Sequence, residues 1–256
     1  MKYRKLDILI LIFFPLFAMV TSIALEANYL ISTLLFFGAP SLYLSVRNYK
    51  IILKSFIFSM LLGFPFATII NSVAVLSKSW LTYSIFDFRF LGLIPIEDFV
   101  FGTLFVYLTI MFYEHLLDKG KDNKIDKKLR LFIIPLTIIF LIFLIIIFKN
   151  SELLNIPYAY FWIGLLAGLL PLAAMLSFFP RLFCKFIKAA SYFFFLTLLF
   201  ELTALHLDQW VFPGDQFIFW VDIAGNRFPF EELFFWVILA SISVLTYYEF
   251  FADDRK

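Results

Sequence analysis

The sequence predicts an all-α membrane protein, a bundle of about eight transmembrane helices. Of its 256 residues, 63% are hydrophobic and 38 are Phe, whereas soluble globular domains contain about 45–50% apolar residues. Only 16% of the residues are charged, and long apolar runs separate them. The alternating segments of about ten residues that a transmembrane β-barrel requires are absent. These observations favour a polytopic helical bundle over a soluble domain or a barrel.

Each apolar run can cover the roughly 20 residues that a spanning helix needs. The first run follows a basic start and lacks a small-residue cleavage pattern, so we interpret it as a retained helix and not as a signal peptide. Eight such runs occupy residues 6–25, 28–46, 52–77, 95–117, 131–149, 157–179, 186–208 and 229–251.

The distribution of Lys and Arg predicts the orientation. If the N-terminus is cytoplasmic, 17 of the 21 Lys and Arg residues fall in inner segments. The outer loops then hold only Lys78, Arg89, Lys149 and Arg227. Because loops rich in Lys and Arg stay on the cytoplasmic side, we expect an integral protein of the inner or cytoplasmic membrane with both termini in the cytoplasm.

The chain also contains two copies of one pattern. Asn71 lies nine residues before Trp80, and Glu201 lies nine residues before Trp210. We therefore expect two four-helix repeats of the same orientation, related by a pseudo-two-fold axis along the membrane normal. The predicted units are residues 1–120 and 131–256, with a cytoplasmic linker at 121–130.

After each tryptophan, a proline and two acids open the last helix of the unit. The two stretches are Pro95-Ile96-Glu97-Asp98 and Pro229-Phe230-Glu231-Glu232. Proline suits a first helical turn and acids there complement the helix dipole, so a capping role is one interpretation. Acids at the mouth of a membrane helix are costly, however, and are functional candidates by default. Because adjacent helical residues point about 100° apart, at least one acid of each pair is expected to face the protein interior.

At these residues the chain resembles the integral-membrane lycopene cyclases, which comprise heterodimeric bacterial enzymes and their fused archaeal and fungal relatives. The family pattern is a tryptophan-containing loop, a Pro-x-Glu-Glu helix start followed by aromatics, and a Tyr-Glu pair near the helix end. The second copy, which ends in Tyr248-Glu249, keeps this pattern, whereas the first, which ends in Tyr113-Glu114, has Asp98 in place of the second Glu. The resemblance covers about half of the chain, mainly residues 71–118 and 201–252.

The resemblance implies a lycopene β-cyclase. A proton adds to the terminal double bond of a linear ψ end group, an internal double bond attacks the resulting cation, and loss of a proton leaves a β-ionone ring. The expected catalytic acids are Glu97, Asp98, Glu231 and Glu232. Aromatic faces stabilise cations, and the expected substrate contacts are Trp80, Phe101, Trp210, Phe235 and Trp236. The expected supporting residues are Asn71, Glu201, Glu114, Glu249, Pro95 and Pro229.

The roles of Asn71 and Glu201 have an alternative, and Glu114 and Glu249 are expected to lie elsewhere. Asn71 and Glu201 either orient the acids or form a helix–helix hydrogen bond. Glu231 and Glu249 are 18 residues apart, a rise of about 27 Å in a helix, and therefore cannot share a site. We expect Glu249 and Glu114 to mark the inner membrane interface instead.

No cofactor and no metal site are expected. The sequence lacks the Gly-x-Gly-x-x-Gly fingerprint of dinucleotide-binding proteins and contains a single cysteine. The expected partners are the lipid bilayer and a hydrophobic carotenoid; other enzymes of carotenoid biosynthesis are further candidates, and nucleic acid is not expected. The alternative functions are a membrane cyclase for C50 carotenoids or other isoprenoids, and a proton-coupled transporter, since buried acids and repeats occur there too.

Overall fold

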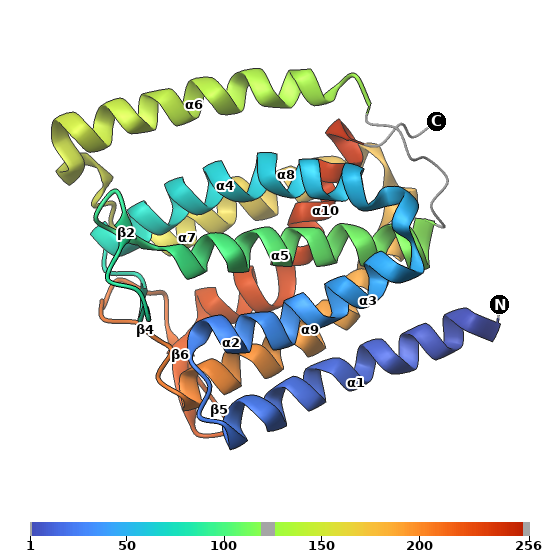
Figure 1. Ribbon diagram of the computed structural model, residues 1–256. Coiled ribbons are helices and arrows are strands. Elements are labelled where there is room, and N and C mark those ends of the chain that lie inside the picture. Colours follow the sequence, from blue (N-terminus) through green and yellow to red (C-terminus); the bar gives the residue numbers. More distant parts are fainter. Residues whose placement is uncertain (1, 119–125, 253–256) are drawn as a thin grey trace.

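The computed structural model describes residues 2–118 and 126–252, with side chains from residue 5 onward. This part of the chain is mostly helical and contains eight helical stretches that are long and apolar enough to cross a membrane (Figure 1). The prediction of a polytopic helical membrane protein is therefore confirmed. The eight spans are Lys5–Ala24, Tyr29–Arg47, Tyr49–Leu76, Ile96–Asp118, Leu129–Leu154, Ala159–Phe178, Pro180–His206 and Glu232–Phe251.

Several spans combine more than one helical segment. The first four spans are built from α1 (Lys2–Ala24), α2 (Tyr29–Thr33), η1 (Leu34–Gly38), α3 (Ala39–Arg47), η2 (Tyr49–Ile51), α4 (Ile52–Leu76), α5 (Ile96–Phe112) and η3 (Tyr113–Asp118). The last four are built from α6 (Leu129–Asn150), η4 (Ser151–Leu154), α7 (Ala159–Ile163), η5 (Gly164–Leu169), α8 (Leu170–Phe178), η6 (Pro180–Leu182), α9 (Phe183–His206), η7 (Glu232–Leu239) and α10 (Ala240–Phe251).

π-helical turns interrupt spans two and six at matching places. In each, a π segment, η1 or η5, directly precedes a helix with proline in its first turn, Pro40 in α3 and Pro171 in α8. Proline lacks an N–H and its ring crowds the preceding turn, and local π adjustments can satisfy the backbone groups that proline frees in a membrane helix. The hydropathy of the sequence does not predict these turns.

Another π segment, η7, changes the register of the last span. Glu97 and Glu114 are 17 residues apart, whereas Glu231 and Glu249 are 18 residues apart. The span that contains Glu97 is α-helical from Ile96 through Phe112, but the span that contains Glu249 is π-helical from residues 232 to 239. Because a π-bulge inserts one residue into a helix, η7 accounts for the extra residue.

Short strands join the loops at one end of the bundle. They are β1 (Leu81–Thr82), β2 (Arg89–Phe90), β3 (Ile94–Pro95), β4 (Trp210–Val211), β5 (Trp220–Ile223) and β6 (Asn226–Pro229). β2 pairs with β3 and β5 with β6 as antiparallel hairpins, whose turns contain Gly92 and Gly225 at positive φ. β1 pairs with β4, so the tryptophan loops of the two predicted units form one antiparallel ladder.

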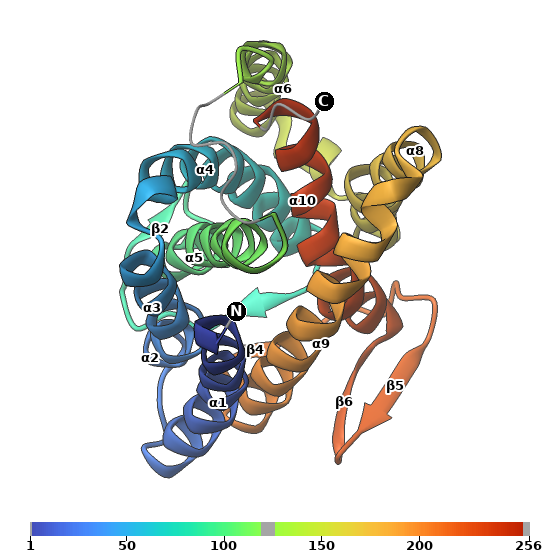
Figure 2. The ribbon, with the colours of Figure 1, turned by 90° about the vertical axis from the view of Figure 1, so that its right-hand side faces the viewer.

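The end-on view shows how the spans interlock (Figure 2). α1 packs against α9, and α6 packs against α4, so the first helix of each predicted unit lies on a helix of the other unit. α6 is peripheral, with most of its surface exposed. The division of the chain into two repeats stays a prediction, and this exchange of outer helices agrees with it.

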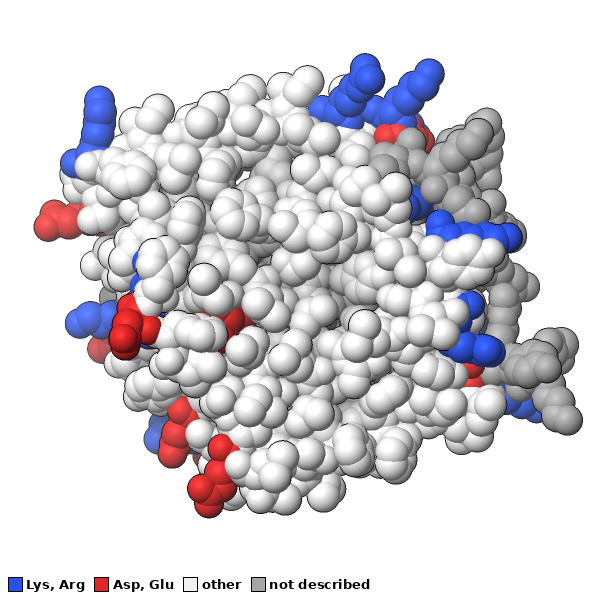
Figure 3. Space-filling view, in the orientation of Figure 1, with Lys and Arg blue, Asp and Glu red and all other residues white. Residues whose placement is uncertain are grey.

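Charged side chains gather at the two ends of the molecule, with a broad uncharged band between them (Figure 3). α1 begins and α10 ends at one end, and the strands lie at the other (Figure 1). An apolar band of this kind is the surface that a lipid bilayer covers. Which end faces the cytoplasm stays a prediction.

Candidate functional site

The two proline-acid stretches begin spans four and eight as expected. Pro95 ends β3 and Pro229 ends β6, and each proline pairs with the first residue of its hairpin, Arg89 or Trp220. Proline has no N–H to leave unsatisfied at a helix start. In each case the hairpin ends at the proline, and the two acids lie in the first turn of the helix that follows it.

The first acid of each pair binds the loop that precedes it. Glu97 accepts hydrogen bonds from the backbone N–H of Ile85 at 2.8 Å and from the hydroxyl of Ser84 at 2.9 Å. Glu231 accepts a hydrogen bond from the backbone N–H of Ile218 at 2.7 Å. Both carboxyl groups are fully buried. Glu97 and Glu231 thus make the same kind of contact in the two halves of the chain.

The second acid of each pair faces a cavity. Asp98 and Glu232 both line a partly open cavity of about 290 Å³ in the middle of the bundle, which we call the central cavity. Glu97 and Glu231 are not among the described residues that line it. The angular separation of neighbouring helical residues therefore divides each pair into one loop-binding acid and one cavity-facing acid.

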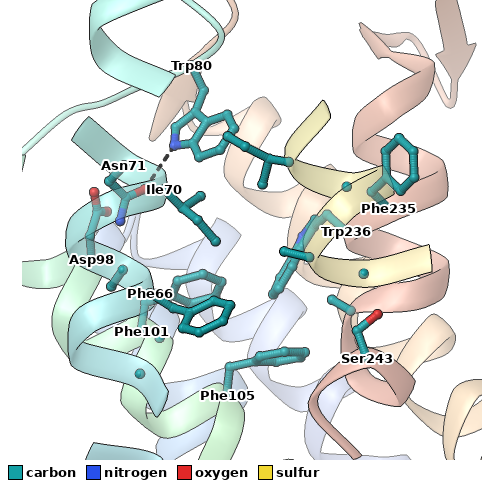
Figure 4. Close-up of a pocket in the computed structure, with 18 of the residues that line it drawn as sticks. Phe66, Ile70, Asn71, Trp80, Asp98, Phe101, Phe105, Phe235, Trp236 and Ser243 are labelled. Atoms are coloured by element: carbon teal, nitrogen blue, oxygen red, sulfur yellow. Dashed lines mark hydrogen bonds between the residues drawn. The ribbon is translucent and has the colours of Figure 1, made fainter. Parts of the chain in front are cut away.

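The central cavity has an apolar and strongly aromatic lining (Figure 4). All five predicted aromatic contacts line it: Trp80, Phe101, Trp210, Phe235 and Trp236. Phe235 reaches the wall because it packs on Gly164, where a Cβ atom would lie 2.1 Å from its ring. Trp236 packs against Phe101 and Phe105, with ring centroids 5.1 and 4.7 Å away.

Asn71 and Glu201 make the same contact at matched positions. The indole N–H of Trp80 donates a hydrogen bond to Oδ1 of Asn71 at 3.1 Å (Figure 4). The indole N–H of Trp210 donates to Oε1 of Glu201, also at 3.1 Å. In each half, this hydrogen bond joins the last turns of a helix to the loop that follows it and holds the tryptophan at the cavity wall.

The two cavity-facing acids have different neighbours. Asp98 is within hydrogen-bonding reach of the hydroxyls of Tyr29 and Thr82, and the guanidinium of Arg89 interacts with it electrostatically. Arg89 is fixed by hydrogen bonds to the carbonyl oxygens of Thr82 and Leu93, each at 3.0 Å. Asp98 is therefore surrounded by donors and a positive charge.

Glu232 lies beside another carboxyl group. The phenol of Tyr160 donates a hydrogen bond to Oε2 of Glu232, and the carboxyl groups of Glu201 and Glu232 are in hydrogen-bonding contact. Oε2 of Glu201 is buried and has no donor among the described residues. Since a carboxylate can only accept hydrogen bonds, the Glu201–Glu232 contact is a hydrogen bond only when the pair holds a proton.

Two tyrosines that were not among the predicted site residues complete the site. Tyr29 begins α2 beside Asp98, and Tyr160 lies in α7 beside Glu232. The ring of Tyr160 packs on Trp80 at 4.8 Å, and the ring of Tyr29 packs edge-on against Trp210 at 5.6 Å. Each tyrosine thus contacts the acid of its own predicted unit and the tryptophan of the other.

Glu114 and Glu249 do not belong to this site. Glu114 lies near the far end of its span, where it accepts hydrogen bonds from Tyr248 and, at 3.5 Å, from Lys54. Glu249 is also buried and borders a small pocket with Lys128 and Arg181. Both acids lie in a separate polar cluster at the end of the bundle where the hairpins are not.

Within the part of the chain that the structure describes, no three His, Cys, Asp or Glu side chains are grouped so that they could hold a metal ion. Comparisons of the chain with family models, with curated proteins and with solved structures find no match.

Proposed function

We propose that the protein is a carotenoid end-group cyclase that closes linear ψ end groups to β-ionone rings by acid–base chemistry. The observation that carries this proposal is that two carboxyl groups, Asp98 and Glu232, face one apolar, aromatic-lined cavity. An alkene is a weak base, so its protonation needs an acid held in a dry site. The motif resemblance to membrane lycopene cyclases supports the same reaction.

Glu232 is assigned as the proton donor. Its carboxyl lies against that of Glu201, and two adjacent buried carboxyl groups readily share one proton. Tyr160 fixes the Glu232 side chain toward the cavity, and Trp210 fixes Glu201. The donated proton adds to the terminal double bond of the substrate and leaves a tertiary cation.

The aromatic wall stabilises that cation without trapping it. Trp80, Trp210 and Trp236 present rings to the cavity together with Phe101 and Phe235. A desolvated cation over such a face gains about 2 kcal/mol, and phenyl and indole rings offer no localised lone pair for covalent capture. The next double bond of the substrate then attacks the cation and closes the six-membered ring.

Asp98 is assigned as the base that accepts the proton lost from the ring. The hydroxyls of Tyr29 and Thr82 and the charge of Arg89 offset part of the cost of burying its carboxylate. The substrate and product are isomers, so no oxidant or reductant is consumed. Before the next turnover, Asp98 releases this proton to water and the Glu201–Glu232 pair takes up another proton from water.

This chemistry applies equally to end groups on longer isoprenoid chains, so a C50 carotenoid cyclase is the alternative with the same site. A proton-coupled transporter is a different class. Transporter sites are typically built around broken helices near the bilayer midplane, whereas the acids here lie in the first turns of spans four and eight. The placement of the acids favours the enzyme.

Expression in cells that accumulate lycopene tests the proposal. Pigments extracted from those cells are expected to contain cyclised products when the wild-type chain is present. Membrane insertion is verified in parallel by fractionation of a tagged chain. Recovery of unchanged lycopene alone from inserted protein would overturn the lycopene assignment, and ring formation only on longer substrates would select the C50 alternative.

A further inference from the structure

Both matched halves contribute an acid, a tyrosine and a tryptophan to the central cavity, but among the described residues η5 of span six lines it and η1 of span two does not. Spans two and six share a constant spacing: Tyr29 and Tyr160 differ by 131 residues, as do Pro40 and Pro171. The short helices η2 and η6, which follow these spans, keep the same spacing. Positions in span six can therefore be matched to positions in span two by this one offset.

Span six presents small side chains to the cavity wall. Ala167 and Gly168 of η5 line it, together with Ile70 of α4. The matched residues of span two are Phe36 and Phe37. Ile70 directly precedes Asn71, and Phe200 directly precedes Glu201, so Phe200 is the counterpart of Ile70.

The three phenylalanines fill the corresponding space on the other side. Phe36, Phe37 and Phe200, which we call the aromatic plug, are all fully buried. Phe200 packs edge-on against Phe37 at 4.8 Å and against Phe36 at 5.2 Å between ring centroids. Phe37 also packs against Phe101, at 5.4 Å. A second cavity related to the first by the repeat is thus closed by side chains.

We infer that the protein has a single chamber that takes one end of a long apolar polyene at a time, and that Ala167, Gly168 and Ile70 determine the space for it. This inference rests on the proposed function. The volume of about 290 Å³ is at the lower limit of the roughly 300–1,000 Å³ of sites that hold drug-sized ligands. It suits one end group and not a whole carotenoid.

The two acids then serve the same end group in one visit, as donor and base, and do not serve the two ends of one molecule. A product with two rings forms by two separate visits. The one-ring product leaves the chamber between them and competes with fresh substrate for re-entry.

A time course with purified protein in liposomes tests this order. With lycopene in large molar excess over protein, the one-ring product is expected to accumulate first, and the two-ring product to appear after a lag. A reaction that ends at the one-ring product also fits a single chamber. Two-ring product that appears without a lag and without free one-ring product would overturn the inference.

Binding measurements separate this inference from the proposed function. Quenching of tryptophan fluorescence by lycopene is expected to titrate to one polyene per protein. Ala167→Phe, which reproduces Phe36, and Ile70→Phe, which reproduces Phe200, are expected to weaken binding at least tenfold. Ile70→Phe is the milder change and keeps the test valid if Ala167→Phe does not fold. Leu170→Phe adds a ring on the exposed face of the same span and serves as the matched control with wild-type binding.

The outcomes are distinct. In one outcome, one lycopene binds per protein, the two filling variants (Ala167→Phe and Ile70→Phe) lose this binding, and no ring forms. The single-chamber inference then holds and the cyclase proposal fails. If rings form but both filling variants, correctly folded, bind and cyclise like the wild type, the chamber inference fails and the cyclase proposal stands. Binding of two polyenes per wild-type protein also overturns the single chamber.

Discussion

The phenol of Tyr160 donates a hydrogen bond to the carboxyl of Glu232, and both side chains are buried at the wall of the central cavity. This contact fixes which way the acid points. Tyr160→Phe removes the donor and leaves the ring, so Trp80 keeps its packing partner. A hydrogen bond between neutral groups is worth about 0.5–1.5 kcal/mol, which predicts a roughly 2- to 10-fold lower rate of ring formation.

The rate is measured in membranes that contain equal amounts of folded protein. Tyr158→Phe is the control, because Tyr158 is exposed and two residues away. Equal rates for Tyr160→Phe and the control would contradict a positioning role for Tyr160.

The cavity-facing and loop-binding acids are expected to respond differently to the same substitution. Glu232→Gln keeps the shape of the side chain but removes its ability to donate a proton to an alkene. General acid catalysis contributes about 10²- to 10⁴-fold, so ring formation is expected to fall by at least about 10² while the protein remains folded. Product yield is measured by chromatography of extracted pigments.

Glu231→Gln is the neighbouring comparison. The amide oxygen still accepts from the N–H of Ile218, but a neutral acceptor binds more weakly than a carboxylate. We expect a loss of stability of roughly 1 kcal/mol, seen as a lower melting temperature, and ring formation within a few-fold of the wild type per folded molecule. A loss of activity as large as that of Glu232→Gln would show that Glu231 takes part in the chemistry.

The base is tested by Asp98→Asn. The amide keeps contact with Tyr29 and Thr82 but cannot accept the proton lost from the ring. Ring formation is expected to fall by at least about 10². Asp222→Asn, in strand β5 away from the cavity lining, is the control. A fully active, correctly folded Asp98→Asn protein would rule out Asp98 as the base.

The cation-stabilising wall is tested at Trp236. Trp236→Leu removes an aromatic face worth about 2 kcal/mol to a desolvated cation, so the rate is expected to fall by roughly 30-fold. Trp236→Phe is expected to recover most of it. Trp162→Leu is the control, because Trp162 is exposed outside the cavity. If the leucine and phenylalanine variants of Trp236 are equally active, the ring face does not stabilise the cation.

Much of the fold could be predicted from the sequence because membrane spans have a strong compositional signal. The first apolar run, at residues 6–25, corresponds to the span Lys5–Ala24, and the last, at residues 229–251, to Glu232–Phe251. The π segments were not predicted. η1 and η5 accompany prolines, and η7 accompanies a single inserted residue. Neither feature changes the hydropathy of a span.

The site could be predicted in part. The proline-acid motif identified Asp98 and Glu232, but which acid of each pair faces the cavity depends on where Ile85 and Ile218 place their N–H groups, and a sequence pattern does not show this. Tyr29 and Tyr160 were missed, although their 131-residue spacing, close to that of the tryptophans, is a signal that could have found them.

The most direct measurement of the central claim is the deuterium content of the ring product formed in D₂O. Isolated membranes that contain the wild-type chain are equilibrated in D₂O before lycopene is added, so the exchangeable proton of the Glu201–Glu232 pair becomes a deuteron. If that pair protonates the terminal double bond, mass spectrometry will find one solvent deuterium per ring, and Glu232→Gln membranes will yield no labelled ring. Cyclised product without solvent deuterium, or labelled rings formed equally well by Glu232→Gln, would contradict it.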